Sequence, residues 1–130
     1  MAYATDAEPF GWDKLFHQSG RNVFEEVSPV AAKHIRDHLA SLDIKPRDVS
    51  RFWLHQANIN MNNMVIKQLL GEDVKAETIP TILERYGNTA SAGSIIAFHL
   101  YQDDLKKNDI GVICSFGAGY SVGSLVLRKL

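Results

Sequence analysis

The sequence predicts a layered α/β fold, with helices packed on a short mixed sheet in the order α-α-β-α-α-β-β. Apolar residues recur at helical spacing from Gly20 onward, and short apolar runs typical of strands occupy 51–54, 110–114 and 124–127. Further helical segments lie between the first two of these runs. A helical connection makes the first two strands parallel, and a short glycine-rich connection makes the last two an antiparallel hairpin.

The first helical region begins at Gly20, after an aperiodic segment, 1–19, that we expect to be an irregular lead-in. Its apolar residues recur every fourth position and form one face, made of Val23, Val27, Ala31, Ile35 and Leu39. Ser28-Pro29 interrupts this run as an N-cap followed by a proline at a first helical position. We therefore expect a short helix that meets a longer one there with a kink.

The middle of the chain alternates strand and helix. Arg51 to Leu54 is a short strand that leads into His55, and Asn58 or Asn60 caps the next helix, which ends near Gly71. The buried face of that helix is expected to hold Met61, Met64, Val65 and Leu69. Thr78 to Tyr86 is predicted to be an extended piece followed by one or two helical turns. A strongly apolar helix from Ser91 to Leu105 is expected to pack deep in the molecule, before two strands that flank a loop at 116–123.

Composition indicates one globular domain and excludes several classes of protein. The 130 residues are 45% hydrophobic and 22% charged, and a net charge of -1 gives no sign of a nucleic-acid or membrane-surface partner. No apolar stretch approaches the ~20 residues that cross a bilayer. The first ten residues lack a secretory signal, and the single Cys114 excludes an internal disulfide. We expect a cytoplasmic protein.

His55 is the first candidate for chemistry, because it directly follows a strand and can project from the carboxyl edge of the sheet. Imidazole has an ordinary pKa of ~6.5, so its surroundings decide whether it donates or accepts a proton. Taken alone, such a position is more often a core or capping histidine. His34 and His38 have the i, i+4 spacing of metal ligands, but no third ligand lies nearby, so we expect no metal.

Asn88 and the glycine-rich loop are the other candidates. Asn88 precedes an apolar helix, where an amide can stabilise an oxygen that gains negative charge, although Gly-Asn is also ordinary turn chemistry. Phe116-Gly117-Ala118-Gly119 contains small residues that let backbone N–H groups approach a ligand. The same stretch could be only a tight hairpin connection.

Together the three motifs carry a family resemblance. His55-Gln56-Ala57-Asn58, Tyr86-Gly87-Asn88-Thr89 and Phe116-Gly117-Ala118-Gly119-Tyr120, in this order, resemble the C-terminal half of β-ketoacyl-acyl-carrier-protein synthase III, a condensing enzyme of the thiolase superfamily. The resemblance runs from about Gly20 to Leu130, so 20–130 is expected to be a domain of this type. It implies a thiolase-like half that is truncated at its N-terminal side, because such a half has a five-stranded sheet and only three strands are predicted here.

The resemblance implies a decarboxylative Claisen condensation of an acyl thioester with a malonyl thioester, in fatty acid or related biosynthesis. A Cys in the family's N-terminal half takes the acyl group. His55 and Asn88 match the residues that hydrogen-bond the malonyl thioester carbonyl and stabilise the enolate as CO2 leaves.

Other residues match supporting parts of that site. The backbone of Ala118, beside Gly117, would form half of an oxyanion hole, and Phe116 would shelter the malonyl carboxylate. Ala57 and Asn58 would lie beside the pantetheine arm of the substrate. The substrates implied are acyl-CoA and malonyl-acyl carrier protein, and no cofactor is implied.

The implied partners are an acyl carrier protein or a CoA thioester, the N-terminal half of the same enzyme, and a second copy in a homodimer. Many members dock the carrier with an arginine where this chain has Asn60, and Lys67 on the same helix face could partly substitute. Cys114 does not match the family's nucleophile and is expected to be a small buried residue, so the chain alone should be inactive.

A non-catalytic reading remains open: a partner subunit or carrier-binding module with the same fold. The complete His/Asn pair favours the catalytic reading, since a purely structural piece needs neither residue.

Overall fold

The computed structural model describes residues 20–71, 74–117 and 119–130, and for residues 20–25 only the backbone. The expected lead-in, 1–19, lies outside the described residues, as does Ala118. The helices are α1 (Gly20–Ser41), α2 (Ile59–Leu70), α3 (Leu83–Tyr86) and α4 (Ala92–Leu100), and the strands are β1 (Val49–Leu54), β2 (Ile110–Gly117) and β3 (Ser121–Arg128). Short 3-10 turns at Pro46–Asp48 and Ala76–Thr78 precede β1 and α3.

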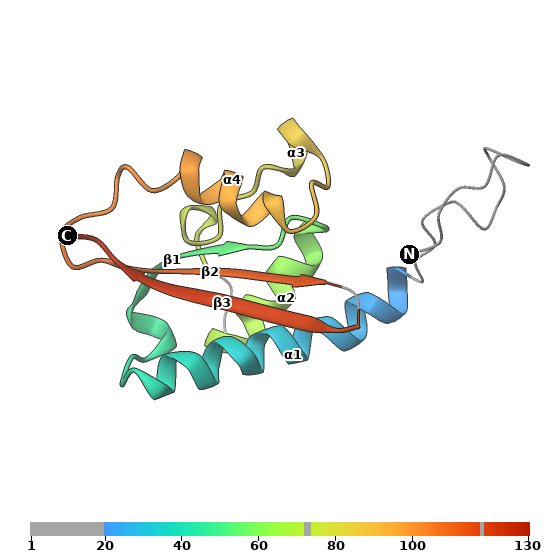
Figure 1. Ribbon diagram of the computed structural model, residues 1–130, viewed down its shortest axis with the longest axis horizontal. Coiled ribbons are helices and arrows are strands. Elements are labelled where there is room, and N and C mark those ends of the chain that lie inside the picture. Colours follow the sequence, from blue (N-terminus) through green and yellow to red (C-terminus); the bar gives the residue numbers. More distant parts are fainter. Residues whose placement is uncertain (1–19, 72–73, 118) are drawn as a thin grey trace, which may run out of the picture.

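The predicted mixed sheet is confirmed. Its strand order is β1-β2-β3, with β1 parallel to β2 and β2 antiparallel to β3. In register, Leu54 lies beside Cys114, so the carboxyl ends of the two parallel strands meet at one edge of the sheet. Helices α1 and α2 cover one face and α4 covers the other (Figure 1), which gives three layers.

The core has two parts, one on each face of the sheet. The larger lies under α1 and α2 and includes Phe52, Leu54 and Val112, while the smaller joins Trp53 and Ile113 to Ala97 of α4. Alternation of side chains along β1 explains the division, because neighbouring strand residues point to opposite faces. Five of the apolar positions predicted for the first two helices are almost fully buried: Val27, Ala31, Ile35, Leu39 and Val65.

The expected division into a short and a longer helix at Ser28-Pro29 is wrong, since α1 is one helix of 22 residues with Pro29 inside it. Proline fixes φ near the helical value, so its main penalty is one lost backbone hydrogen bond and a local clash. Val27, Ala31 and Ile35 on either side are at most 1% exposed. Burial of this apolar stripe offsets the penalty and keeps the helix continuous. The predicted element order is therefore corrected at its first step, and the short helix α3 adds a third helix between β1 and β2.

Two further boundaries differ from the prediction. Helix α4 ends at Leu100, and its residues are not all buried, since Ile95 is 52% exposed. Tyr101 ends the helix because its carbonyl accepts hydrogen bonds from Arg51 Nη1 (2.7 Å) and Trp53 Nε1 (3.2 Å). The glycine-rich loop is also shorter than expected, because β2 extends to Gly117 and β3 begins at Ser121.

Candidate functional site

Two of the predicted site residues, His55 and Phe116, meet at the carboxyl edge of β1 and β2. His55 directly follows β1, and Phe116 is the second-last residue of β2. The two rings lie with centroids 4.2 Å apart and planes tilted by 33°. Two of the three motifs are therefore in direct contact, as expected for the ends of neighbouring parallel strands.

His55 is held in a dry position. Its side chain is 8% exposed, and burial lowers the pKa of the imidazole below its ordinary value. The lowered pKa favours the neutral ring, because burial disfavours the charged form. Among the described residues, Nδ1 of His55 is buried without a hydrogen-bond partner. The ring is therefore neutral at neutral pH and keeps a polar atom uncommitted.

Asn88 lies in the segment between α3 and α4 and is exposed. Gly87 before it has φ of 65°, in the left-handed region that favours glycine, and this conformation turns the chain away from α3. Oδ1 of Asn88 accepts a hydrogen bond from the Ala90 backbone N–H at 2.9 Å. Because the carbonyl end is used within the turn, the amide NH2 is the end that can donate to a ligand.

Gln56 connects the His55 segment to the Asn88 segment. It is completely buried, and its Nε2 donates to the Leu54 carbonyl at 2.9 Å. Its Oε1 accepts from the Ile82 backbone N–H at 3.0 Å and from Thr81 Oγ1 at 3.3 Å. A Cβ added at Gly93 would lie 2.5 Å from Gln56 Cβ, so the start of α4 packs directly on this side chain.

A pair of serines connects α4 to β2. The Ser94 and Ser115 hydroxyls lie 2.6 Å apart, and either can donate to the other. Both also lie within hydrogen-bond distance of the Ser91 carbonyl oxygen, which is 3.0 Å from Ser94 Oγ and 3.2 Å from Ser115 Oγ. These contacts tie the first turn of α4 to the strand that carries Phe116. The Asn88 segment is thus anchored to both neighbouring motifs.

The remaining predicted site residues are half-buried or exposed. Ala57 is half-buried, and Asn58 is exposed, with its Oδ1 accepting from the Asn60 backbone N–H at 2.8 Å as the cap of α2. Gly117 is exposed at the end of β2. The predicted oxyanion contact at Ala118 lies outside the described residues. Asn60 and Lys67, the positions considered for carrier docking, are both exposed on α2.

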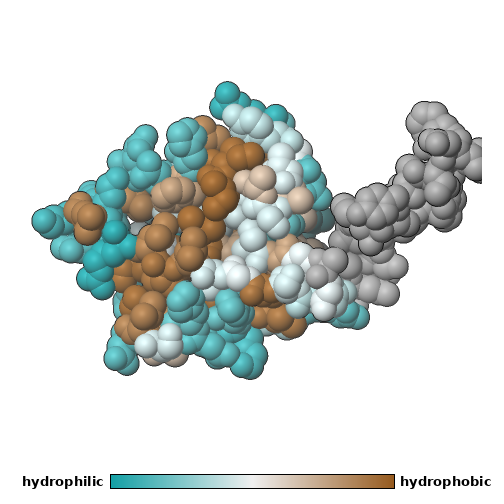
Figure 2. All heavy atoms as spheres, viewed as in Figure 1, coloured by the Kyte–Doolittle hydropathy of each residue, from teal (hydrophilic) through white to brown (hydrophobic). Residues whose placement is uncertain are grey.

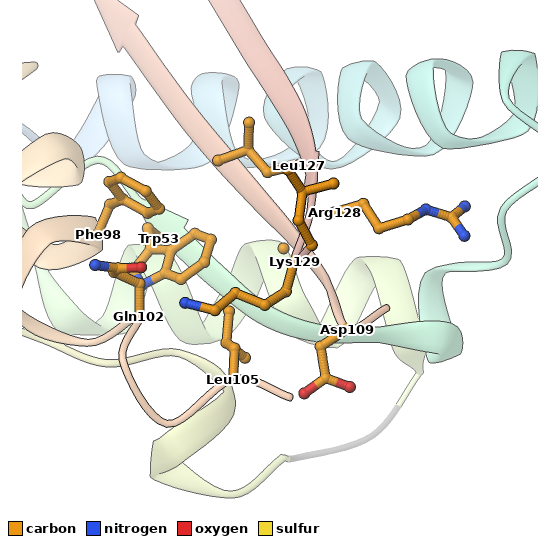
Figure 3. Close-up of a pocket in the computed structure, with 10 residues that line it drawn as sticks. Trp53, Phe98, Gln102, Leu105, Asp109, Leu127, Arg128 and Lys129 are labelled. Atoms are coloured by element: carbon orange, nitrogen blue, oxygen red, sulfur yellow. The ribbon is translucent and has the colours of Figure 1, made fainter. Parts of the chain in front are cut away.

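Two hollows among the described residues are lined by neither His55 nor Asn88. One of about 400 Å³ is shown in Figure 3, where Trp53 and Phe98 form its wall beside Leu105 and Leu127. The rings of Trp53 and Phe98 meet edge to face with centroids 4.9 Å apart. The other, of about 710 Å³, lies between α2, residues 74–81 and the segment after α4. Neither is lined by the predicted catalytic pair.

Cys114 and His38 lie in surroundings that indicate a structural role. Cys114 is 1% exposed, and burial raises the pKa of its thiol to about 12, so it carries little thiolate at neutral pH. His38 Nδ1 is hydrogen-bonded to Ser124 Oγ at 2.7 Å. Across the described ranges, no group of three or more His, Cys, Asp or Glu side chains could hold a metal ion, and none of the helices is long and apolar enough to cross a membrane.

Sequence reasoning missed the residues that connect the motifs, namely Gln56 as a buried hub and the Ser94–Ser115 pair. One signal for them was present in the sequence. Gly93 and Ser94 are small residues within an otherwise apolar helix, a pattern that indicates close packing against a neighbour.

Comparison with known proteins identifies the family. The model for the C-terminal part of 3-oxoacyl-[acyl-carrier-protein] synthase III matches residues 39–129. A β-ketodecanoyl-[acyl-carrier-protein] synthase from Pseudomonas aeruginosa is 56% identical over 117 residues, which are 90% of this chain and 33% of the relative. A β-ketoacyl-[acyl-carrier-protein] synthase III from Lactobacillus helveticus is 30% identical over 128 residues, 97% of this chain and 38% of the relative.

Solved structures agree. A 3-oxoacyl-(acyl carrier protein) synthase III from Pseudomonas aeruginosa PAO1 superposes with a TM-score of 0.77 and 27% identity, covering 99% of this chain and 39% of that one. The enzyme of this name from Aquifex aeolicus also gives 0.77 and 27%, over 87% of this chain and 36% of the other. The chain spans about a third of the length of the curated relatives that it matches. It belongs to the 3-oxoacyl-[acyl-carrier-protein] synthase III family and corresponds to the C-terminal part of that enzyme.

Proposed function

We propose that the chain is the C-terminal domain, residues 20–130, of a condensing enzyme that joins an acyl thioester to a malonyl thioester carried by an acyl carrier protein. The observation that supports this most is the joining of His55 and Asn88 segments through one buried side chain, Gln56. A neutral imidazole and an amide NH2 are the donors that a thioester carbonyl needs as it becomes an enolate.

In the proposed reaction, the bond between the malonyl α-carbon and its carboxylate breaks, and the electron pair is delocalised into the thioester carbonyl as an enolate. His55 and Asn88 donate hydrogen bonds to that oxygen while CO2 leaves. The α-carbon then attacks the acyl group held on a cysteine outside this chain, and the cysteine thiolate departs. The atoms and electrons balance without a cofactor.

The remaining residues support the same step. The His55 ring stacks against Phe116, and this apolar contact would shelter the malonyl carboxylate from water and favour its loss as CO2. Ala57 and Asn58, at the start of α2, would border the pantetheine arm. The backbone at Gly117 and Ala118 would complete an oxyanion hole for the acyl step. Lys67, exposed on α2, would contribute to docking of the acidic carrier.

The test is malonyl thioester decarboxylation by the full-length enzyme that carries this chain. His55→Ala and Asn88→Ala should each lower kcat by roughly 10²- to 10³-fold, the usual effect of removing one donor to an oxyanion. Matched controls are His99→Ala and Asn63→Ala, which remove the same groups from exposed positions elsewhere. Unchanged decarboxylation in the first two variants would contradict this function and favour a non-catalytic, carrier-binding module.

One comparison favours a particular product length. The relative named for β-ketodecanoyl formation is 56% identical, against 30% for the Lactobacillus helveticus synthase III. We therefore propose a ten-carbon β-ketoacyl product, made by adding two carbons to an eight-carbon donor. Competition among acyl donors of increasing length should give the highest kcat/KM for that donor. Preference for an acetyl donor would contradict this choice and leave the condensation itself intact.

A further inference from the structure

We propose that Gln56 is a positioning residue, which holds the His55 donor and the Asn88 donor at a fixed separation. This inference rests on the proposed function, because it concerns the geometry of that site. The inference goes beyond the proposed function, because Gln56 would touch no substrate and would act only through its two neighbours.

The contacts of Gln56 require a side chain that donates at one end and accepts at the other. One end must donate to the Leu54 carbonyl, and the other must accept from both the Ile82 N–H and Thr81 Oγ1. Among neutral side chains, only an amide combines a donor nitrogen with an oxygen that accepts two hydrogen bonds. The side chain is 0% exposed, so water cannot replace it at these groups. Its loss would leave buried backbone groups unpaired.

The contacts also enclose the Asn88 segment on both sides. Ile82 precedes Asn88 in the chain, and Gly93 follows it, and Gln56 touches both positions. A Cβ placed at Gly93 would lie 2.8 Å from Gln56 Cγ and 2.9 Å from Thr89 Oγ1, so Thr89 borders the same space. Meanwhile Gln56 is covalently next to His55 and bonded back to Leu54. One buried side chain therefore fixes the position of the His55 segment relative to the Asn88 segment.

The first variant removes the hydrogen bonds and keeps the volume. Gln56→Met in the full-length enzyme should lower kcat for malonyl thioester decarboxylation by roughly tenfold or more, with KM nearly unchanged, since small displacements of catalytic groups have effects of this size. Thermal unfolding and circular dichroism, measured beside the assay, set the temperature at which the variant is fully folded. A kcat equal to that of the unaltered enzyme would overturn the proposal.

The second variant separates positioning from folding. In Gln56→Glu, the protonated carboxyl can donate to Leu54 and accept from Ile82, as the amide does. The ionised carboxylate cannot donate to Leu54. Burial raises the pKa of a carboxyl group, so the protonated form persists at mildly acidic pH. The ratio of variant kcat to unaltered kcat should be near one in acid and fall roughly tenfold as pH rises, at temperatures where both proteins are folded.

The ratio removes titrations that are the same in both proteins, whereas the His55 ring would titrate at a higher pH beside the ionised carboxylate of the variant. His55 is the titratable group next in the chain, and Glu84 and Arg85 on α3 are exposed beyond Ile82. All three are present in both proteins, whereas the carboxyl at 56 is present in one. A ratio that does not change with pH would overturn the proposed positioning role.

The two hypotheses fail in different ways. If His55→Ala and Asn88→Ala leave decarboxylation unchanged, the proposed function fails, and the positioning role falls with it. If those variants lose activity while Gln56→Met keeps it, the positioning role alone fails. Loss in all of them, together with a pH-dependent ratio for Gln56→Glu, supports both.

Discussion

The imidazole of His55 shows how position changes the chemistry of a single residue. Its pKa is lowered by burial, so the folded state binds a proton at this ring less readily than the unfolded chain does. Stability from this group is therefore fully present above the ordinary histidine pKa of ~6.5 and is lost as pH falls through the window below it.

We predict that the free energy of unfolding of this chain falls as pH drops below that value, and that His55→Asn removes part of the fall. Urea unfolding at a series of pH values checks this, and an NMR titration of the His55 ring should give a pKa below the ordinary one. His99→Asn, at an exposed position, is the control. An unaltered slope in His55→Asn would contradict the prediction.

At the same scale, the sequence predicted the positions of the candidate donors but not what connects them. His55 and Asn88 could be placed because each lies next to a recognisable strand or helix boundary. The role of Gln56 could not be predicted, since its partners Thr81 and Ile82 are 25 and 26 residues away in the chain. Only the folded arrangement shows that a buried amide joins them.

Among the elements, α1 departs most clearly from local sequence rules. Pro29 is exposed inside a continuous helix, where proline is unfavourable by ~3 kcal/mol relative to alanine. Four buried apolar residues hold the helix in place regardless: Val27, Ala31, Ile35 and Leu39. Two helices were expected because capping chemistry is local, whereas the burial that overrides it depends on the sheet beneath.

We predict that Pro29→Ala raises the free energy of unfolding by roughly 1–3 kcal/mol, because a backbone N–H and its helical hydrogen bond are gained without loss of buried surface. Chemical denaturation measures the change. Val30→Ala, at a neighbouring position that is 45% exposed, should change stability by no more than about 0.5 kcal/mol. Destabilisation by Pro29→Ala would show instead that the sheet packs against a helix shaped by the proline.

Helix α4 was predicted to be longer than it is, for a related reason. The helix was predicted to run to Leu105, but Arg51 binds the Tyr101 carbonyl and pairs with Asp104 at 2.5 Å, and these contacts draw the chain out of helical geometry. Strand pairing, in contrast, was predicted correctly, because the length of each connection limits whether strands can be parallel or antiparallel.

For the whole molecule, the distribution of apolar surface is the main feature. Figure 2 shows an apolar region that crosses the visible face between α4 and α1. Large exposed apolar residues of α4, β3 and the C-terminus include Ile95, Leu125 and Leu130, with Leu125 57% exposed. Contiguous surface of this kind on a small domain favours association with another apolar surface.

We predict that the isolated chain self-associates through this face and that Leu125→Lys lowers the association constant at least about tenfold, because a charge would then be desolvated in the contact. Sedimentation velocity over a range of concentrations measures the effect. Leu42→Lys is the control, since Leu42 is 49% exposed and lies directly after α1, outside β3 and α4. Equal effects of the two substitutions would contradict a specific apolar contact at β3.

The close approach of Gly93 to Gln56 has a consequence for how this protein can change over evolution. The Gly93 backbone and the Gln56 stem share a space that admits one Cβ and not two. A descendant that gains a side chain at position 93 must either lose the whole side chain at 56 or move the start of α4 away from it, and either change gives up contacts that join the two motifs. The two positions are therefore expected to vary together among relatives, and glycine should persist wherever the glutamine does.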